Sequence, residues 1–400
     1  PFMANAKWID NLVVRASYGL QGNIDKNTSP YLLGNYRIEN ILPGGSEDMI
    51  DVSGAPNKKL RWEKTHSVNA GFDFAVLNQA INLSVDYYYR KGVDLIGTQM
   101  LPLETGFEML TVNWASMQNQ GVEVALSTRN IHTKNFMWTT NFNFAYNNNK
   151  VLKEALREDA LEPGREGYPV GALFALKTAG LDEEGYPMFQ DKDGKAVSAM
   201  EFFKLQEWGF GATDLTARER RELYTYVGTA DCPYTGGFNN TFTYKAFELG
   251  VNFSSDFGGK VRSQPTYSIV DFDKGRNTNR DILNRWTPEN TETIFPVLLS
   301  QNERLDEYMW YSNQNEIYRN LDIWIRDLNY VRLQNIRLGY TLPTNFSRKL
   351  GMTSATIAIE GRNLLVFGSS YKNYLDPETM SNAYATPAPK SVTLSLNLNF

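Results

Sequence analysis

The sequence predicts an all-β fold in which about ten long antiparallel strands form part of a membrane-spanning β-barrel. Three observations lead to this prediction. Apolar and polar residues alternate along several segments, these segments are longer than ordinary soluble strands, and short and long connections follow one another in strict order. No segment of comparable length carries apolar residues at helical spacing.

The alternation is clearest between residues 135 and 147. A period of two places successive side chains on opposite faces of a strand. One face here carries Phe136, Trp138, Thr140, Phe142, Phe144 and Tyr146. The other face carries Met137, Thr139, Asn141, Asn143, Ala145 and Asn147. We therefore expect a strand whose two faces meet different environments, and similar patterns recur at 67–74, 80–90 and 391–400.

The same pattern predicts ten strands along the chain, at residues 12–20, 62–76, 79–90, 116–129, 134–148, 236–245, 246–255, 326–342, 354–367 and 389–400. Their lengths, roughly 9–17 residues, exceed the 5–6 residues that are typical of soluble sheets. A tilted strand needs about 9–11 residues to cross a bilayer. The predicted strands are long enough to do so.

The connections between these strands alternate in length. The short ones lie at 77–78, 130–133, 245–246 and 343–353, and the long ones at 21–61, 91–115, 149–235, 256–325 and 368–388. In an antiparallel barrel this order places all short turns at one end and all long loops at the other. Outer-membrane barrels have this asymmetry, with short periplasmic turns and long extracellular loops. An even number of strands then places the C-terminus in the periplasm.

A soluble β-sandwich with one solvated face is the alternative explanation of the alternation. Three features favour the barrel. The polar faces are rich in Asn, Ser, Thr and Gly, and aromatic residues such as Tyr146, Tyr244 and Tyr340 lie near predicted strand ends, as in interfacial girdles. Several loops also exceed the ~12–15 residues that structureless connections in compact domains reach, which is typical of functional surface loops.

Composition excludes several other classes of protein. The 40 Lys and Arg against 45 Asp and Glu give a net charge of −5, so the chain lacks the basic footprint of a nucleic-acid-binding protein. No uncharged apolar run reaches the length of a transmembrane helix. The single cysteine, Cys232, excludes an internal disulfide framework, and two distant histidines, His66 and His132, argue against a histidine-rich metal site.

Several motifs, taken in order, give the chain a family resemblance. They are Trp8–Asn23, Leu60–Thr65, Val85–Lys91, Asn119–Glu123, Tyr234–Phe242 with Tyr244 and Lys245, Tyr330–Asn335, Leu338–Pro343, Gly361–Leu365, Asp376–Glu378 and the terminal Phe400. Together these motifs resemble the barrel of SusC/RagA-type TonB-linked outer-membrane proteins. They span nearly the whole chain, and it is their combination and order that make the resemblance specific.

The resemblance implies a 22-stranded barrel with an internal plug, powered by the TonB complex and covered outside by a SusD-like lipoprotein. It implies import of oligosaccharides or oligopeptides across the outer membrane. Residues 1–400 are then expected to be the C-terminal part of the barrel, without the plug and the N-terminal strands. Loops 149–235 and 256–325 are expected to be extracellular, and Phe400 to be a signal for the barrel-assembly machinery. We expect such a part not to close alone, because lipid cannot satisfy two free sheet edges.

In a barrel, the polar faces of the strands point to the lumen or to the plug that fills it. The side chains expected there are Arg15, Ser17, Gln21, Asn69, Asp73, Asp86, Arg90, Glu123, Asn141, Asn143, Asn252 and Arg337. Hydrogen bonding to the plug and lining of a hydrated wall is their expected role. Contact with substrate is the alternative role.

Aromatic residues beside amides in the long loops are candidates for ligand or partner contact, because aromatic faces can pack on sugars. Loop 256–325 contributes Tyr308, Trp310, Tyr311, Asn313, Gln314 and Asn315, and loop 149–235 contributes Trp208, Tyr224 and Tyr226. Aromatic residues that merely pack a loop look the same in sequence. Both interpretations therefore stay open.

The sequence offers little for catalysis or for a cofactor. It contains no G-x-S-x-G motif and no phosphate-binding loop, so we expect no enzyme activity. The segment Asp191–Gly194 resembles a Ca²⁺ loop, but its glycine comes two residues too early for an EF-hand, and a plain turn is expected. Helical patterns at 201–206 and 216–223 predict a small helical insertion. The alternatives to an importer are a secreted β-rich glycan-binding or hydrolytic domain, and a barrel with a structural or secretion-associated role.

Overall fold

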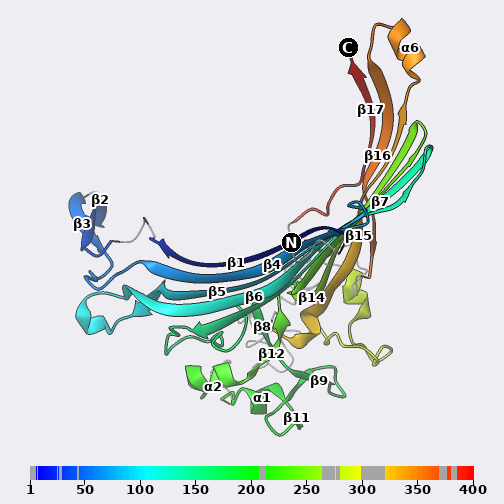
Figure 1. The fold of residues 1–400 in the computed structure, drawn as a ribbon. Coiled ribbons are helices and arrows are strands. Elements are labelled where there is room, and N and C mark those ends of the chain that lie inside the picture. Colours follow the sequence, from blue (N-terminus) through cyan, green and yellow to red (C-terminus); the bar gives the residue numbers. More distant parts are fainter. Residues whose placement is uncertain are drawn as a thin grey trace.

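The computed structural model describes residues 6, 8–24, 26, 29–42, 45–206, 213–263, 275, 280–298, 320–368, 376–379 and 385–400. Ten of the strands form one antiparallel sheet in which each strand pairs with the next one along the chain (Figure 1). These strands are β1 (Ile9–Asn23), β4 (Glu63–Val76), β5 (Ile81–Met100), β6 (Met109–His132), β7 (Phe136–Lys153), β13 (Tyr234–Tyr244), β14 (Phe247–Arg262), β15 (Ile325–Thr341), β16 (Ser354–Phe367) and β17 (Ser391–Asn399). All ten predicted strands are thus confirmed.

Several strands are longer than predicted, and the expected long connection 91–115 is wrong for most of its length. β5 continues to Met100 and β6 already begins at Met109. The pairing is interrupted by a bulge between Gly92 and Leu95, where Asp94 has a positive φ of 56°. Beyond that bulge the residues lose the apolar–polar alternation. A strand that extends into water needs no apolar face, so alternation does not detect it.

The register of the sheet separates an apolar from a polar face. One row of directly paired residues is apolar across nine strands: Leu12, Phe74, Leu83, Leu126, Phe142, Phe238, Phe253, Leu333 and Leu365. A neighbouring row is polar across eight strands, and it lies one residue from the apolar row in β5, β6, β7, β13 and β14: Asn82, Ser127, Asn141, Asn239, Asn252, Asn335, Arg362 and Ser391. Directly paired residues share a face. The polar and apolar faces therefore run continuously around the sheet.

Short turns join the strands at one end of the sheet. The β4–β5 turn places Leu77, Asn78 and Gln79 in the left-handed region, and Lys245 does the same between β13 and β14. The link between β15 and β16 holds the short helix α6 (Thr344–Lys349). The opposite end carries the longer insertions, so the predicted alternation of short and long connections holds apart from the β5–β6 link.

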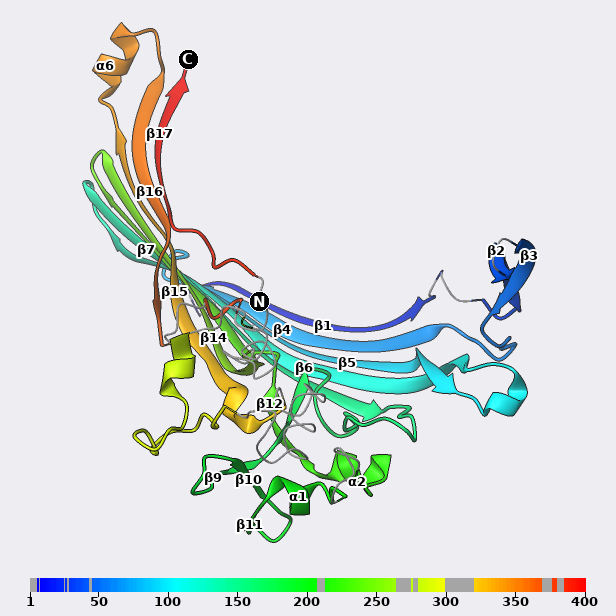
Figure 2. The same cartoon turned by 180° about the vertical axis from the view of Figure 1, so that it is seen from behind.

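The sheet does not close on itself. Within the described residues, β1 pairs with β4 and β17 pairs with β16, and the two outer strands do not pair with each other. Figures 1 and 2 show the sheet curving from β1 to β17 as an open shell. None of the helices in the described part of the chain is long and apolar enough to cross a membrane.

The two longest insertions pack together into one small unit. It contains β8 (Ala172–Leu176), β9 (Thr178–Leu181), β10 (Pro187–Gln190), β11 (Ala196–Val197), β12 (Tyr224–Thr229) and the helices α1 (Ala199–Phe202) and α2 (Ala217–Glu222), together with the 3-10 segments η2 (Arg280–Asn284) and η3 (Asp322–Trp324). Its core includes Leu176, Phe189 and Phe202 from the first insertion and Leu321 and Trp324 from the second. The Thr178 hydroxyl donates to the Asp322 carboxylate over 2.6 Å.

The predicted helical insertion lies in this unit: α2 falls within the predicted 216–223, whereas α1 overlaps the predicted 201–206 only at Glu201 and Phe202. α2 begins with a capping box in which Thr216 and Glu219 satisfy each other's backbone N–H groups. Two further strands, β2 (Leu33–Leu42) and β3 (Gly45–Ser53), form a separate hairpin between β1 and β4, and a short 3-10 turn η1 (Leu103–Thr105) lies between β5 and β6.

Candidate functional site

The polar face of the sheet collects the side chains that were expected to face a lumen. Cross-strand register and alternation place all twelve on that face: Arg15, Ser17, Gln21, Asn69, Asp73, Asp86, Arg90, Glu123, Asn141, Asn143, Asn252 and Arg337. Arg15 connects three strands, because its guanidinium donates to Asp73 over 2.8 Å and to Asp86 over 2.9 Å. Arg15, Asp73 and Asp86 therefore form one ion-pair cluster.

A hollow of about 530 Å³ lies on the polar face. Its polar lining comprises Ser84, Asp86, Glu123, Asn143, Thr235, Asn252, Ser254, Ser255, Asp256 and Gln334. Gly236 and Gly237 form part of its floor, and a Cβ at Gly237 would lie 2.4 Å from the Asn143 Oδ1 atom. The glycine therefore lets Asn143 lie across β13 and keeps the hollow open.

The remaining predicted residues lie apart from this hollow. Arg337 donates to Glu248 over 2.9 Å, and the Asn69 amide lies 3.5 Å from the Ser17 hydroxyl. The Arg90 guanidinium lies 5.6 Å from the centre of the Tyr88 ring. The polar face is thus a series of local clusters along the wall, with the hollow between two of them.

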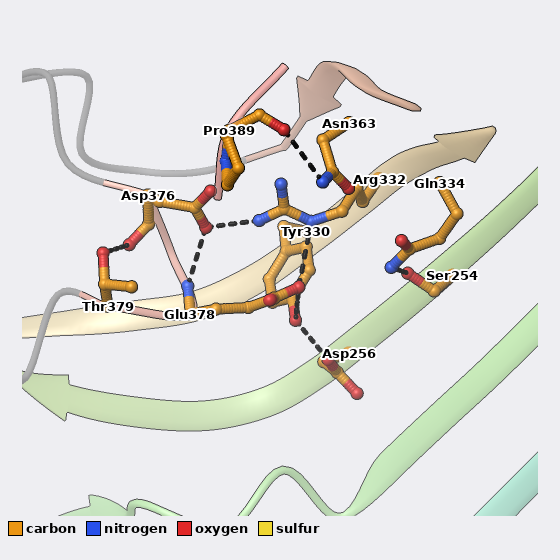
Figure 3. Close-up of polar contacts among 10 residues, drawn as sticks. All are labelled: Ser254, Asp256, Tyr330, Arg332, Gln334, Asn363, Asp376, Glu378, Thr379 and Pro389. Carbon is orange, nitrogen blue, oxygen red and sulfur yellow. Dashed lines mark hydrogen bonds and ion pairs between the residues drawn. The ribbon is translucent and has the colours of Figure 1, made fainter. Parts of the chain in front are cut away.

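A second cluster on the polar face, which we call the Arg332 cluster, consists of Asp256, Tyr330, Arg332, Asp376 and Glu378 (Figure 3). Arg332 is only 1% exposed, although it carries a charge. Its Nη2 atom donates to Asp376, and its Nε atom donates to Glu378 over 2.9 Å. The Tyr330 hydroxyl lies within hydrogen-bond distance of both Asp256 and Glu378.

The two acidic residues that Arg332 binds belong to a short segment, 376–379, which we call the strap. Within the strap, the Glu378 N–H donates to the Asp376 carboxylate over 3.1 Å, and the Thr379 N–H donates to the Asp376 carbonyl over 2.9 Å. Pro377 is buried between them. Arg332 thus holds a compact turn of the last long connection against the polar face, beside the hollow that Asp256 also lines.

Arg332 was missed by sequence analysis because of a bulge in β15. Counting in twos from Arg337 places Arg332 on the apolar face. The register shifts between Leu333 and Asn335, so that Gln334 is an extra residue and Arg332 pairs with Ser254 on the polar face. An arginine on a lipid-facing position costs about 2–4 kcal/mol at the bilayer midplane, and that cost is the signal in the sequence that argues for a bulge here.

The aromatic candidates of the long loops are mostly outside the described residues. Trp208, Tyr308, Trp310, Tyr311, Asn313, Gln314 and Asn315 all lie there. Tyr224 packs against the core of the loop unit, and the Tyr226 ring lies 4.7 Å from that of Tyr168. Burial raises the pKa of Tyr226 above its ordinary value. These two tyrosines therefore pack the loop unit.

The described residues contain no cluster of three or more His, Cys, Asp and Glu side chains that could hold a metal ion. The Asp191–Gly194 segment is a turn between β10 and β11, in which the Asp191 carboxylate accepts from the N–H groups of Asp193 and Lys195 at 3.0 and 2.8 Å. Burial raises the pKa of the Cys232 thiol, which makes it a weak nucleophile. Phe400 follows β17 and is 82% exposed.

Comparison with known proteins gives consistent matches. A family model described as "TonB dependent receptor-like, beta-barrel" matches residues 3–364. The TonB-dependent receptor P3 of Formosa agariphila is 27% identical over 429 residues, which cover 100% of this chain and 40% of that protein. The TonB-dependent receptor SusC of Bacteroides thetaiotaomicron is 24% identical over 430 residues, covering 100% of this chain and 38% of that protein.

A solved structure of the RagAB peptide transporter superposes with a TM-score of 0.76 at 23% identity, covering 100% of this chain and 42% of the other. This likeness shows a shared fold. The chain spans about two fifths of the length of the relatives it matches.

Proposed function

The chain belongs to the TonB-dependent receptor-like β-barrel family, and from that premise we propose that it forms part of the wall of an outer-membrane importer of oligosaccharides or oligopeptides. Barrels of this family are outer-membrane proteins. The substrate and the partners of this particular importer are the proposed part.

One observation carries the proposal: a continuous apolar row and a continuous polar row run around the sheet on its opposite faces. Lipid requires an apolar outer surface and a sheet whose backbone groups are all paired. A hydrated passage requires a polar inner surface. This sheet has both surfaces and is ten strands wide, and its polar face is open where Gly236 and Gly237 lack side chains. It therefore fits the wall of such a passage.

We place the short turns in the periplasm and the long insertions outside the cell. The ten strands then bring the C-terminus to the periplasm, where Phe400 would be available as an assembly signal. The loop unit, which includes parts of 149–235 and 256–325, would face the exterior.

A SusD-like surface lipoprotein is the proposed partner outside, and the TonB complex the proposed partner in the periplasm. The support is the similarity to SusC and to a peptide transporter. We expect Trp208, Tyr308, Trp310, Tyr311, Asn313 and Asn315 to contact this lipoprotein or the ligand. Replacing Trp310 and Tyr311 with alanine should lower uptake or lipoprotein association, measured in cells and by co-purification. Unchanged values for both would remove these residues from the proposal.

The decisive experiment is deletion of the full-length gene, with uptake of labelled oligosaccharides and oligopeptides measured in energised cells and in cells without TonB. The proposal expects loss of uptake of one class, restored by the intact gene only when TonB is present. Soluble, hydrolytic protein after membrane fractionation would favour the secreted domain instead. Unchanged uptake by cells that retain a heat-modifiable barrel would favour a structural or secretion-associated role.

A further inference from the structure

The β2–β3 hairpin has two chemically different faces. It stands clear of the ten-stranded sheet beyond the far end of β1 (Figures 1 and 2). One face carries Tyr36, Ile38, Ile50 and Val52, which are 66%, 64%, 71% and 45% exposed, and at its edge Asp48, which pairs with Ile38 and accepts a hydrogen bond from the Tyr36 hydroxyl. Tyr36 pairs directly with Ile50, and Gly34 pairs with Val52. A Cβ at Gly34 would lie 2.7 Å from the Ile50 Cγ2 atom, so the glycine lets Ile50 extend the apolar face.

The opposite face of the hairpin is an ordinary solvent face. Arg37 lies 3.4 Å from Glu39 and 3.7 Å from Asp51, and all three side chains are about half exposed. Isolated two-stranded hairpins are marginally stable in water, and contiguous exposed apolar surface marks a site of interaction. The four apolar side chains Tyr36, Ile38, Ile50 and Val52 are contiguous on one face, whereas the other face mixes Arg37, Glu39 and Asp51 with Leu33 and Met49, so the first face is the candidate for a covering surface.

Both arms of the hairpin confine it to the outer end of the sheet. β1 ends at Asn23 and β2 begins at Leu33. On the return side, the Ala55 N–H donates to the Met109 carbonyl over 3.3 Å and the Asn57 amide donates to the Thr111 carbonyl over 2.7 Å. Arg61 then pairs with Asp94 at 2.5 Å. The hairpin is thus held between the outer ends of β1 and β6.

The neighbour of the hairpin on its other side is the free edge of β1. Unpaired backbone groups along a membrane-spanning edge are not tolerated in lipid, so another strand must pair with β1 in the complete barrel. The relatives are about two and a half times as long as this chain, which leaves ample sequence for that strand. Its outer loop would emerge next to the hairpin.

We propose that Tyr36, Ile38, Ile50 and Val52 form an intramolecular docking surface for an apolar outer loop of the remainder of this protein, the loop beside the strand that pairs with β1. The hairpin then closes the outer seam of the barrel. This inference rests on the proposed function in one respect, namely that the sheet is completed into a barrel.

The test uses the full-length protein in intact cells, with the photoreactive residue benzoylphenylalanine at position 36 and mass spectrometry of the adducts. The expected product is a crosslink within one chain, to a loop outside residues 1–400. A crosslink to a surface lipoprotein, or to a second copy of the chain, would overturn the proposal. So would the absence of any adduct.

Trypsin gives an independent readout, because Arg37 is the single basic residue of the hairpin. In purified monomeric full-length protein without lipoprotein, cleavage at Arg37 should be slow. The double substitution Tyr36→Asp with Ile50→Asp should raise the rate of cleavage at Arg37 by about tenfold or more, because cleavage follows the fraction of molecules in which the hairpin is undocked. The matched control on the charged face, Glu39→Ser with Asp51→Ser, should leave it unchanged. Fast cleavage in the unmodified protein would overturn the proposal.

Failure of this inference is distinguishable from failure of the proposed function. Heat-modifiable material in the outer membrane with loss of uptake on gene deletion supports the importer. If that material shows no intramolecular crosslink at position 36, the docking surface is wrong while the importer stands. If the protein is soluble, the importer itself is wrong.

Discussion

Replacing Arg332 with methionine should release the strap from the polar face. The Arg332 side chain is 2% exposed and that of Asp376 is 7% exposed, so the change leaves a buried carboxylate without its cation. Breaking a buried ion pair in this way costs about 3–5 kcal/mol. Glu378 is 43% exposed and can be hydrated when Arg332 is lost, so most of the cost lies at Asp376.

The cost should appear as local opening of residues 376–379. Two strap amides, those of Glu378 and Thr379, donate hydrogen bonds to Asp376 and report on this opening. Because about 1.4 kcal/mol corresponds to a factor of ten, a cost of 3 kcal/mol raises the open population by about 100-fold or more. Hydrogen exchange of the peptide that spans the strap, in the full-length protein in detergent, measures the change directly.

Arg15 provides the matched control. It also binds two carboxylates on the polar face, but its side chain is 47% exposed. Exposed pairs contribute about 0.2–1 kcal/mol each, so Arg15→Met should change exchange near Asp73 and Asp86 much less. Adding Asp376→Asn to Arg332→Met should restore slow exchange in part, since no buried charge is then left unpaired. Unchanged hydrogen exchange of the strap in Arg332→Met would refute the claim that Arg332 holds the strap on the polar face.

Two further predictions concern the hollow and the loop unit. Gly237→Ala should lower the free energy of unfolding of the full-length barrel by about 1–3 kcal/mol in urea, because the added Cβ would lie 2.4 Å from the Asn143 Oδ1 atom. Gly250→Ala is the control, since nothing lies within 4 Å of a Cβ at that position. Equal losses of stability in the two variants would contradict the packing argument. The Thr216 N–H and hydroxyl lower the pKa of Glu219, so its contribution to the α2 cap is present above the ordinary value of 4.5 and is lost as the pH falls through the lowered pKa. The protection of residues 216–222 against hydrogen exchange, corrected for intrinsic exchange rates, should therefore fall in acid in the unmodified protein but not in Glu219→Gln. The same acid response in both proteins would contradict this role of Glu219.

The sequence predicts those parts of the fold in which two faces of a strand meet different environments. Phe142 and Asn143 are adjacent, and their opposite chemistry reveals a strand without further information. The same logic fails at Thr98 and Gln99, which lie in the outward extension of β5 where both faces carry polar residues. It fails again at Gln334, because a single extra residue reverses the faces, and the only sign of the bulge in the sequence is the charge of Arg332 at a position that counting in twos assigns to the apolar face.

Contacts between distant segments are the other part that could not be predicted. The core of the loop unit joins Leu176 to Leu321 and Trp324, and the strap joins Asp376 to Arg332. Each of these partners has ordinary neighbours in the sequence. Their pairing depends on how the long insertions fold back over the sheet, which periodicity does not encode. Arg15, Asp73 and Asp86 were predicted individually for the polar face, whereas the ion-pair cluster that they form was not.

The central claim is that one face of this sheet meets lipid and the other meets water, and a cysteine scan of β7 tests it most directly. In the full-length protein with Cys232→Ser, single cysteines replace Asn141, Phe142, Asn143 and Phe144 in turn. A water-soluble maleimide should label positions 141 and 143, whereas lipid-borne quenchers should reach probes at 142 and 144. Uniform labelling of all four positions, or the reverse alternation, would contradict the account.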